Sequence, residues 1–253
     1  MRFLVTADTD IGIAKRTNQD SVLLKHAMFE DMEVLMAIVC DGMGGLAKGE
    51  LASATVIRTF SNWFDTALAD ALARPDLNAV GAQWSGMLKA ENAKIRAFSA
   101  PLKLSMGTTF CGMLMINDRY LIANVGDSRA YRIDTALRQL TEDQTFVARE
   151  IKRGNMTPEQ AKVDRRRNML LQCVGASPVV EPALLFGSVE RGVYMLCSDG
   201  FRHEISPQEI YGALCPAALP DAQTMQRNGR MLIELVKRRQ ETDNISVVLI
   251  KAA

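Results

Sequence analysis

The sequence predicts an α+β domain in which antiparallel sheets are covered by helices. Short strand-like runs dominate both ends of the 253-residue chain, a long helical pair lies between them, and short turns join neighbouring strands. Apolar residues make up 48% and charged residues 23% of the chain, which is ordinary globular composition and excludes a disordered protein. Because no repeat or linker divides the chain, we expect residues 1–253 to form a single domain.

The strand predictions depend on apolar runs and turn signals. Residues 34–40 are continuously apolar, which is typical of a strand buried on both faces. Residues 108–116 and 120–125 flank Asn117-Asp118-Arg119, and this spacing predicts a hairpin. The other predicted strands are 130–133, 192–197 and 245–250.

The helix predictions depend on composition and on end signals. Residues 49–73 and 78–99 are rich in helix-forming residues, and a proline follows each segment closely. Thr157 followed by Pro158 resembles a capped helix start. Residues 221–240 predict a further helix that is basic in its last turn.

Charge and cysteine content limit the partners and the compartment. Thirty basic and twenty-nine acidic residues leave a net charge of +1, so we expect neither nucleic acid nor an anionic membrane as the main partner. The longest apolar run is about a third of the roughly 20 residues that cross a bilayer, and the first residues lack the apolar core of a signal peptide. Five scattered cysteines indicate no disulfide framework. We therefore expect a soluble, cytoplasmic protein.

Four aspartates stand at the ends of predicted strands. Asp41, Asp127 and Asp199 each follow a strand, and Asp243 precedes the last one. In antiparallel sheets the end of one strand lies beside the start of its neighbour, so these acids can meet at one edge although the sequence separates them widely.

Clustered carboxylates are stable mainly when cations neutralise them, and a site made only of oxygen ligands suits Mg²⁺ or Mn²⁺. With only His26 and His203 in the chain, a histidine-based zinc or iron site is not expected. The alternative is that each aspartate merely caps a turn, as Asp-Gly pairs commonly do. The glycines after Asp41 favour a ligand site, because backbone without side chains lets a ligand approach closely.

Seven short motifs, in this order, resemble the metal-dependent protein phosphatases of the 2C type, and most of all their compact bacterial members. The resemblance runs from about residue 8 to residue 250. The motifs are Arg16-Thr17-Asn18-Gln19-Asp20, Asp41-Gly42-Met43-Gly44-Gly45, Gly107-Thr108-Thr109, Asn124-Val125-Gly126-Asp127-Ser128-Arg129, Leu140-Thr141-Glu142-Asp143, Ser198-Asp199-Gly200 and Asp243-Asn244-Ile245-Ser246.

The resemblance implies a central β-sandwich of two antiparallel sheets flanked by α-helices, in four layers. It also implies two tightly bound Mg²⁺ or Mn²⁺ ions, with a possible weaker third. The substrates would be phosphoserine and phosphothreonine proteins, and the chain would oppose a bacterial Ser/Thr kinase as a monomer. Two cations would activate a water that attacks phosphorus in line, which requires no covalent intermediate.

The resemblance also assigns roles to individual residues. Asp41 would bridge the two ions, and the Gly42 carbonyl would bind one of them. Asp199 and Asp243 would complete the shell of the second ion, and Asp20 would order water beside the ions. Asp127, together with Asp199, would bind the third ion.

Several positions depart from the family pattern. Lys15 stands where an arginine usually binds the substrate phosphate, and Arg16 is the alternative anchor; both could instead be solvated surface charges. If the segment is extended, strand alternation would turn only one of the two towards the ions, and Lys15 is our prediction. Gln19 replaces a frequent glutamate, and Met43 and Leu46 replace histidines.

Residues 143–180 match the variable flap of the family, which lies beside the site. Within it, Arg165, Arg166 and Arg167 could contact the phosphoprotein substrate, although such a run by itself is typical of a solvated surface. The sequence therefore predicts a serine/threonine protein phosphatase. A pseudophosphatase that only binds phosphoproteins and a hydrolase of small phosphoesters remain the alternatives.

Overall fold

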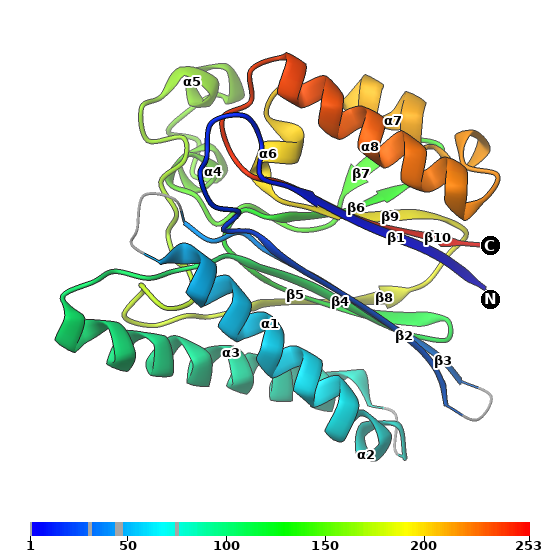
Figure 1. The fold of residues 1–253 in the computed structure, drawn as a ribbon, viewed down its shortest axis with the longest axis horizontal. Coiled ribbons are helices and arrows are strands. Elements are labelled where there is room, and N and C mark those ends of the chain that lie inside the picture. The colour runs from blue at the N-terminus through cyan, green and yellow to red at the C-terminus, as the bar shows by residue number, and fades with distance from the viewer. Residues whose placement is uncertain (1, 30–31, 44–47, 74–75) are drawn as a thin grey trace.

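Two five-stranded antiparallel sheets lie face to face in the computed structural model, which describes residues 2–29, 32–43, 48–73 and 76–253 (Figure 1). The first sheet has the order β1 (Phe3–Asp10), β10 (Ile245–Ala252), β9 (Gly192–Cys197), β6 (Arg129–Ile133) and β7 (Leu137–Gln139). The second has the order β2 (Ser21–Phe29), β3 (Met32–Cys40), β4 (Phe110–Ile116), β5 (Arg119–Val125) and β8 (Ala183–Ser188).

Helices cover the outer face of each sheet, which confirms the predicted four-layer sandwich (Figure 1). The second sheet carries α1 (Gly49–Thr66), α2 (Leu68–Ala73) and α3 (Leu77–Ser99), and the first carries α6 (Asp199–Arg202), α7 (Pro207–Leu214) and α8 (Ala222–Arg238). Two short helices, α4 (Phe146–Lys152) and α5 (Pro158–Val163), lie in the connection between β7 and β8, and 3₁₀ turns occupy Ala100–Leu102 and Pro216–Ala218. None of the described helices combines the length and the apolar character that crossing a membrane requires.

The apolar run 34–40 is explained by the two layers that β3 separates. Alternate side chains of a strand point to opposite faces. Val34, Met36 and Ile38 therefore pack under the helices α1 and α3, whereas Leu35 and Val39 pack against the other sheet. A strand covered on both faces has no place for polar side chains, and this constraint produces its continuous apolar sequence.

The helix ends agree with the capping signals, with one correction. Residues 49–73 do not form one helix, because α1 ends at Thr66 and α2 begins at Leu68. The predicted box at Thr157 is confirmed: its hydroxyl accepts the Gln160 N–H while the Gln160 side chain accepts the Thr157 N–H. Asp76 and Asp221 cap α3 and α8 in the same way, each accepting one backbone N–H.

Strands β1 and β2 are absent from the sequence prediction because polar residues interrupt their alternation. Asp8 and Asp10 of β1 face the helix α8, where their charges are paired. The Asp8 carboxylate lies 3.0 Å from Arg230 Nε, and the Asp10 carboxylate lies 3.1 Å from Lys237 Nζ. Tertiary ion pairing therefore places acids in a strand that its local sequence does not identify.

An aromatic cluster fixes the helical layer on the second sheet. The Trp84 side chain of α3 is fully buried, with ring centroids 5.5 Å from Trp63 and 5.0 Å from Phe60 in edge-to-face geometry. Phe110 of β4 completes the cluster at 4.5 Å from Phe60. Edge-to-face aromatic pairs add to the burial energy, so this cluster is a main connection between α1, α3 and the sheet.

Two substitutions in α3 test this packing. Trp84→Ala should lower the free energy of unfolding by about 3–5 kcal/mol, because it leaves a cavity in the aromatic cluster. Gly86→Ala, on the exposed side of the same helix, should raise it by about 0.8–1 kcal/mol, since an added Cβ meets no atom within 4 Å. Urea denaturation of both variants measures the two effects, and a cost below about 1 kcal/mol for Trp84→Ala would contradict the role of the cluster.

Candidate metal centre

Five aspartates from separate parts of the chain meet at one end of the sandwich. Asp20 precedes β2, Asp41 follows β3, and Asp127 lies between β5 and β6. Asp199 begins α6 directly after β9, and Asp243 precedes β10. Figure 1 shows this end of the sandwich, where α6 and the connection between β1 and β2 lie. The aspartates that the sequence places at strand ends thus lie close together in the structure.

The backbone of Asp41 is held by two neighbouring threonines. Thr109 Oγ1 accepts the Asp41 N–H at 2.9 Å, and the Thr109 N–H donates to the Asp41 carbonyl at 2.8 Å. The Thr108 hydroxyl donates to the same carbonyl at 2.9 Å. Both threonines are buried, so Asp41 leaves β3 in a single fixed direction.

Gly42 is required at its position by close backbone packing. A Cβ on this residue would lie 2.4 Å from the Gln19 carbonyl oxygen and 2.6 Å from the Gly49 carbonyl oxygen. The Gly42 N–H donates to the Gln19 carbonyl at 3.2 Å. Only glycine lets these three segments approach one another, and their contact brings the start of α1 to the acids.

Asp20 is buried and held by one hydroxyl of the last strand. Its side chain is 7% exposed, and the Ser246 hydroxyl donates to Oδ2 at 2.7 Å. Burial raises the pKa of Asp20 to about 7; the Ser246 and Ser198 hydroxyls oppose this rise, and the charges of Asp199 and Asp243 add to it.

Burial and the neighbouring carboxylates together raise the pKa values of three of the five acids. Burial raises the pKa of Asp41 well above its ordinary value, and the four other aspartates raise it further. Burial and Asp199 raise the pKa of Asp127 to about 6, although Arg202 lowers it. Such a set of carboxylates is one that bound cations stabilise.

The residues present fit hard divalent cations. In the described part of the chain, Asp20 Oδ1 and Asp199 Oδ1 are buried without a hydrogen-bond partner. No three carboxylate, His or Cys side chains among the described residues lie so that they could hold one metal ion together. Mg²⁺ typically keeps several waters and uses only one or two carboxylates, so an open set of acids suits it better than a cage does.

Lys15 and Arg16 lie differently with respect to the acids. Lys15 Nζ is 2.9 Å from Asp243 Oδ1, whereas Arg16 is exposed. Burial lowers the pKa of Lys15, but the hydrogen bond to Asp243 and the neighbouring acids outweigh this effect and raise the pKa above its ordinary value. The segment before Lys15 is not extended as predicted, because residues 12–14 form a turn. Lys15 faces the acids because of this turn and not because of strand alternation.

Asp127 is already paired with an arginine. Arg202 Nη2 lies 3.4 Å from Asp127 Oδ2 and donates to the Asp127 carbonyl at 3.1 Å. Any cation bound at Asp127 therefore shares this carboxylate with a guanidinium. Arg202 stands three residues after Asp199, on α6, and the sequence analysis missed it because nothing in the local pattern marks it.

A second group that the sequence analysis missed lies behind the acids. His203 Nε2 is 3.6 Å from Asp199 Oδ2, and His203 Nδ1 is 3.7 Å from Glu241 Oε2. The other oxygen of Glu241 accepts the Asp243 N–H at 2.9 Å. Glu241 thus contacts both the backbone of Asp243 and the His203 ring that faces Asp199. Its position two residues before Asp243 is the feature of the sequence that could have identified it.

The other three departures from the family pattern, at Gln19, Met43 and Leu46, have different surroundings. The Gln19 N–H donates to Asn244 Oδ1 at 2.9 Å, and its side-chain amide donates to Glu50 at 3.3 Å, so Gln19 ties the acids to α1. The Met43 N–H donates to the Gly107 carbonyl at 3.0 Å. Leu46 lies outside the described residues.

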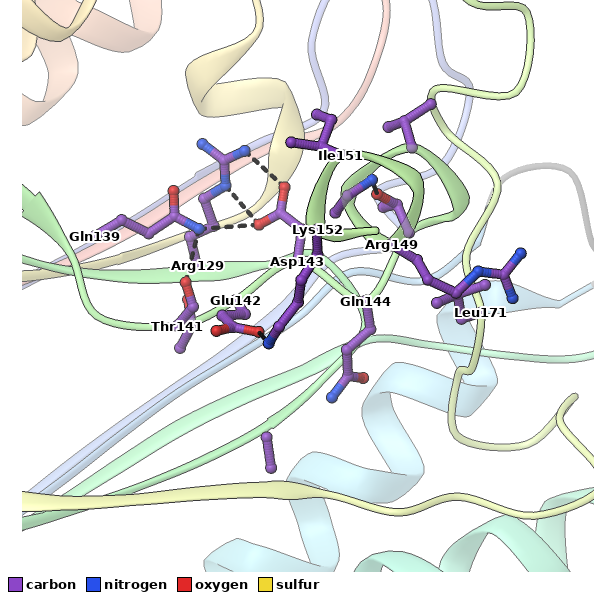
Figure 2. Close-up of a pocket in the computed structure, with 14 residues that line it drawn as sticks. Arg129, Gln139, Thr141, Glu142, Asp143, Gln144, Arg149, Ile151, Lys152 and Leu171 are labelled. Carbon is purple, nitrogen blue, oxygen red and sulfur yellow. Dashed lines mark hydrogen bonds and ion pairs between the residues drawn. The ribbon is translucent and has the colours of Figure 1, made fainter. Parts of the chain in front are cut away.

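Residues of the predicted flap and of the adjoining sheets line a hollow of about 790 Å³. Figure 2 shows two guanidinium nitrogens of Arg129 and the side-chain nitrogen of Gln139 directed at the Asp143 carboxylate. Helix α4 forms the opposite wall, which includes the apolar side chains of Val147 and Ile151. The base of the flap is therefore joined to the first sheet by a two-pronged ion pair.

The flap arginines do not act alike. Arg166 pairs with Asp164 at 2.9 Å, and its guanidinium lies 4.1 Å from the ring centre of Phe146. Arg167 Nη1 donates to the Lys162 carbonyl at 3.1 Å, and Arg165 is exposed. Arg166 thus holds α5 against α4, which distinguishes it from its two neighbours.

Comparison with known proteins agrees with this architecture. The model of the protein phosphatase 2C family matches residues 13–209. The serine/threonine protein phosphatase PstP of Mycobacterium tuberculosis is 32% identical over 96% of the chain, which spans 44% of that relative. The protein phosphatase PhpP of Streptococcus pneumoniae is 31% identical over 96% of the chain and 94% of its own length.

Solved structures agree as well. The serine/threonine phosphatase of S. agalactiae superposes with a TM-score of 0.87 at 27% identity, with both chains covered completely. The catalytic domain of PstP in complex with two manganese ions gives 0.77 at 29% identity, covering 98% of this chain and 97% of that one. With a family match over most of its length and a fold shared from end to end, the chain belongs to the protein phosphatase 2C family.

Proposed function

We propose that the chain, as a single domain over residues 1–253, hydrolyses phosphoserine and phosphothreonine on proteins with the help of Mg²⁺ or Mn²⁺. The observation that carries the proposal is the meeting of five aspartates at one end of the sandwich, where burial and neighbouring carboxylates raise the pKa values of Asp20, Asp41 and Asp127. The relatives named serine/threonine phosphatase, one of them solved with two manganese ions, support the same activity.

In this proposal each acid has one role towards the ions. Asp41 would be shared by two ions, the Gly42 carbonyl would help to hold one of them, and Asp199 and Asp243 would hold the other. Asp20 orders water at the site through the carboxylate that Ser246 holds. When bound, the ions activate water for in-line attack on phosphorus and offset the charge of the phosphoryl oxygens.

The rest of the chain positions these groups. Thr108 and Thr109 fix the direction of Asp41, and Glu241 fixes the backbone of Asp243. Lys15, as the phosphate anchor, adds a positive charge on the side of Asp243. Rigid positioning of this kind keeps the acids in place in spite of their repulsion, which is the usual way in which a site is preorganised.

The substrates in this proposal are proteins phosphorylated by a Ser/Thr kinase that the chain opposes, with the chain acting as a monomer in the cytoplasm. Five free cysteines agree with a reducing compartment. A pseudophosphatase that only binds phosphoproteins is not favoured, because binding alone has no need for all five acids. Comparison of turnover on a phosphopeptide and on a small phosphoester would reveal whether the small phosphoester is the true substrate.

The metal-centre proposal is tested by Asp199→Asn. Loss of one ligand charge should lower turnover of a phosphothreonine peptide by at least about 10²-fold, since metal activation contributes several kcal/mol. Asp70→Asn, on the exposed surface of α2, is the matched control and should keep full activity. The measurements are turnover in Mn²⁺, with and without chelator, and the melting temperature. Near-normal Mn²⁺-dependent turnover of Asp199→Asn would show that Asp199 is not a metal ligand.

A third, weaker ion at Asp127 is part of the proposal. Asp127→Ala should leave two tightly bound ions while it lowers protein dephosphorylation, because an acid that Arg202 already neutralises can hold another cation only loosely. Calorimetric titration with Mn²⁺ counts the ions. Loss of the tight pair in this variant would place Asp127 in the core of the centre.

Single substitutions of the two adjacent basic residues, Lys15 and Arg16, test which of them binds the substrate phosphate. Lys15→Ala should raise KM and lower kcat/KM by about 10-fold or more, the effect of a lost charge-assisted contact of about 1.5–3 kcal/mol. Lys15→Arg should keep or improve activity, and Arg16→Ala, which removes an exposed side chain, should have the smaller effect. A crippling Arg16→Ala beside a silent Lys15→Ala would make Arg16 the anchor.

A further inference from the structure

A second hollow, of about 430 Å³, lies between the flap and α6. Asp127, Arg202 and His203 line the side that borders the aspartates, and Lys162 and Arg167 line the flap side. Because His203 Nε2 is 3.6 Å from Asp199, this hollow is next to the proposed metal centre. A substrate whose phosphate lies at the aspartates can therefore place a neighbouring side chain in it.

The charges around this hollow are not balanced. Its acids Asp127 and Asp143 are already paired, the first with Arg202 and the second with Arg129 through two bonds of 2.6 and 2.7 Å. Figure 2 shows the second pair.

Lys162 and Arg167 form no ion pair with any residue that the structure describes. Glu204, an exposed acid that also lines the hollow, is the one carboxylate left to oppose them, and the nearby Arg239 partly offsets its charge. The flap side of the hollow is therefore positive.

Among Arg165, Arg166 and Arg167, only Arg167 lines this hollow. Its Nη1 is held by the Lys162 carbonyl at the end of α5, which leaves the other guanidinium nitrogens available to a ligand. Arg166 is occupied by Asp164 and Phe146. Arg165 is exposed and lines neither this hollow nor the larger one at the base of the flap.

We propose that this hollow is a subsite for an anionic side chain that the substrate carries within a few residues of its phosphorylated residue. A guanidinium held at one nitrogen binds a carboxylate or a second phosphoryl group with two parallel hydrogen bonds, and Lys162 adds a point charge. An extended peptide advances about 3.3 Å per residue, so a group one to three residues away can reach across a hollow of this size. The inference rests on the proposed phosphatase activity and names the class of its preferred substrates.

The experiment measures kcat/KM for a family of phosphothreonine peptides that differ at one position. Each of the three positions on either side of the phosphothreonine carries in turn Asp, Asn or phosphoserine. At the best position, the peptide with Asp should be hydrolysed about 5-fold or more faster than the peptide with Asn, since a charge-assisted contact on a half-open surface is worth that much. Comparison of Asp with phosphoserine at this position distinguishes a carboxylate from a second phosphoryl group as the natural occupant.

Arg167→Gln should reduce the ratio of the two rates to below about 2-fold, and Lys162→Gln should reduce it in part. Arg165→Gln removes the same charge two residues away and should keep the ratio. Because a merely structural change lowers the rates for both peptides together, the ratio isolates the contact.

Three outcomes would overturn the inference: no preference of the unaltered chain for an acidic group at any position, an unchanged ratio in Arg167→Gln, or an equal loss in Arg165→Gln. A chain that hydrolyses none of the peptides in Mg²⁺ or Mn²⁺ would overturn the proposed function itself. A chain that hydrolyses all peptides equally would overturn the subsite alone.

Discussion

Repulsion among carboxylates is the constraint on which the rest of this structure depends. Five aspartates lie at one end of the sandwich, and the buried ones cannot all be ionised without a cation beside them. The surrounding contacts oppose this repulsion one residue at a time. Backbone hydrogen bonds hold Asp41, a serine hydroxyl holds Asp20, and a lysine pairs with Asp243. The fold thus holds carboxylates that repel one another in fixed positions.

A sandwich of antiparallel sheets is well suited to this arrangement. Each acid stands next to the beginning or end of a strand, so the adjoining ladder limits where its backbone can lie while its side chain reaches beyond the core. The strands themselves are covered on both faces, as in β3, and close packing leaves the strand ends little freedom. Close approach of Gly42, Gln19 and Gly49 then joins the helical layer to the same end. Packing far from the acids therefore determines how they are placed.

Sequence reasoning succeeded where a residue's role is local. Continuous apolarity identified β3, the capping box identified the start of α5, and the aspartates at strand ends identified the candidate site. It failed where the role depends on a distant partner. The acids of β1 are acceptable only because α8 supplies Arg230 and Lys237, and no window of the sequence contains both. The roles of Arg202 and His203 were not predicted for the same reason, whereas the position of Glu241 two residues before Asp243 was an available signal.

The flap shows how one run of like residues divides into different roles. Arg166 is fixed on Phe146 and Asp164, where the ion pair lowers the pKa of Asp164 to about 2, so this residue holds the flap together. Arg167 lines the hollow beside the aspartates, whereas Arg165 lines neither of the two hollows at the flap. The run of arginines in the sequence does not predict these different roles, because the turn after α5 determines where each arginine side chain lies. The aspartate end of the sandwich and the flap can therefore change independently, and in the proposed function the first would set the chemistry and the second would set which phosphoproteins reach it.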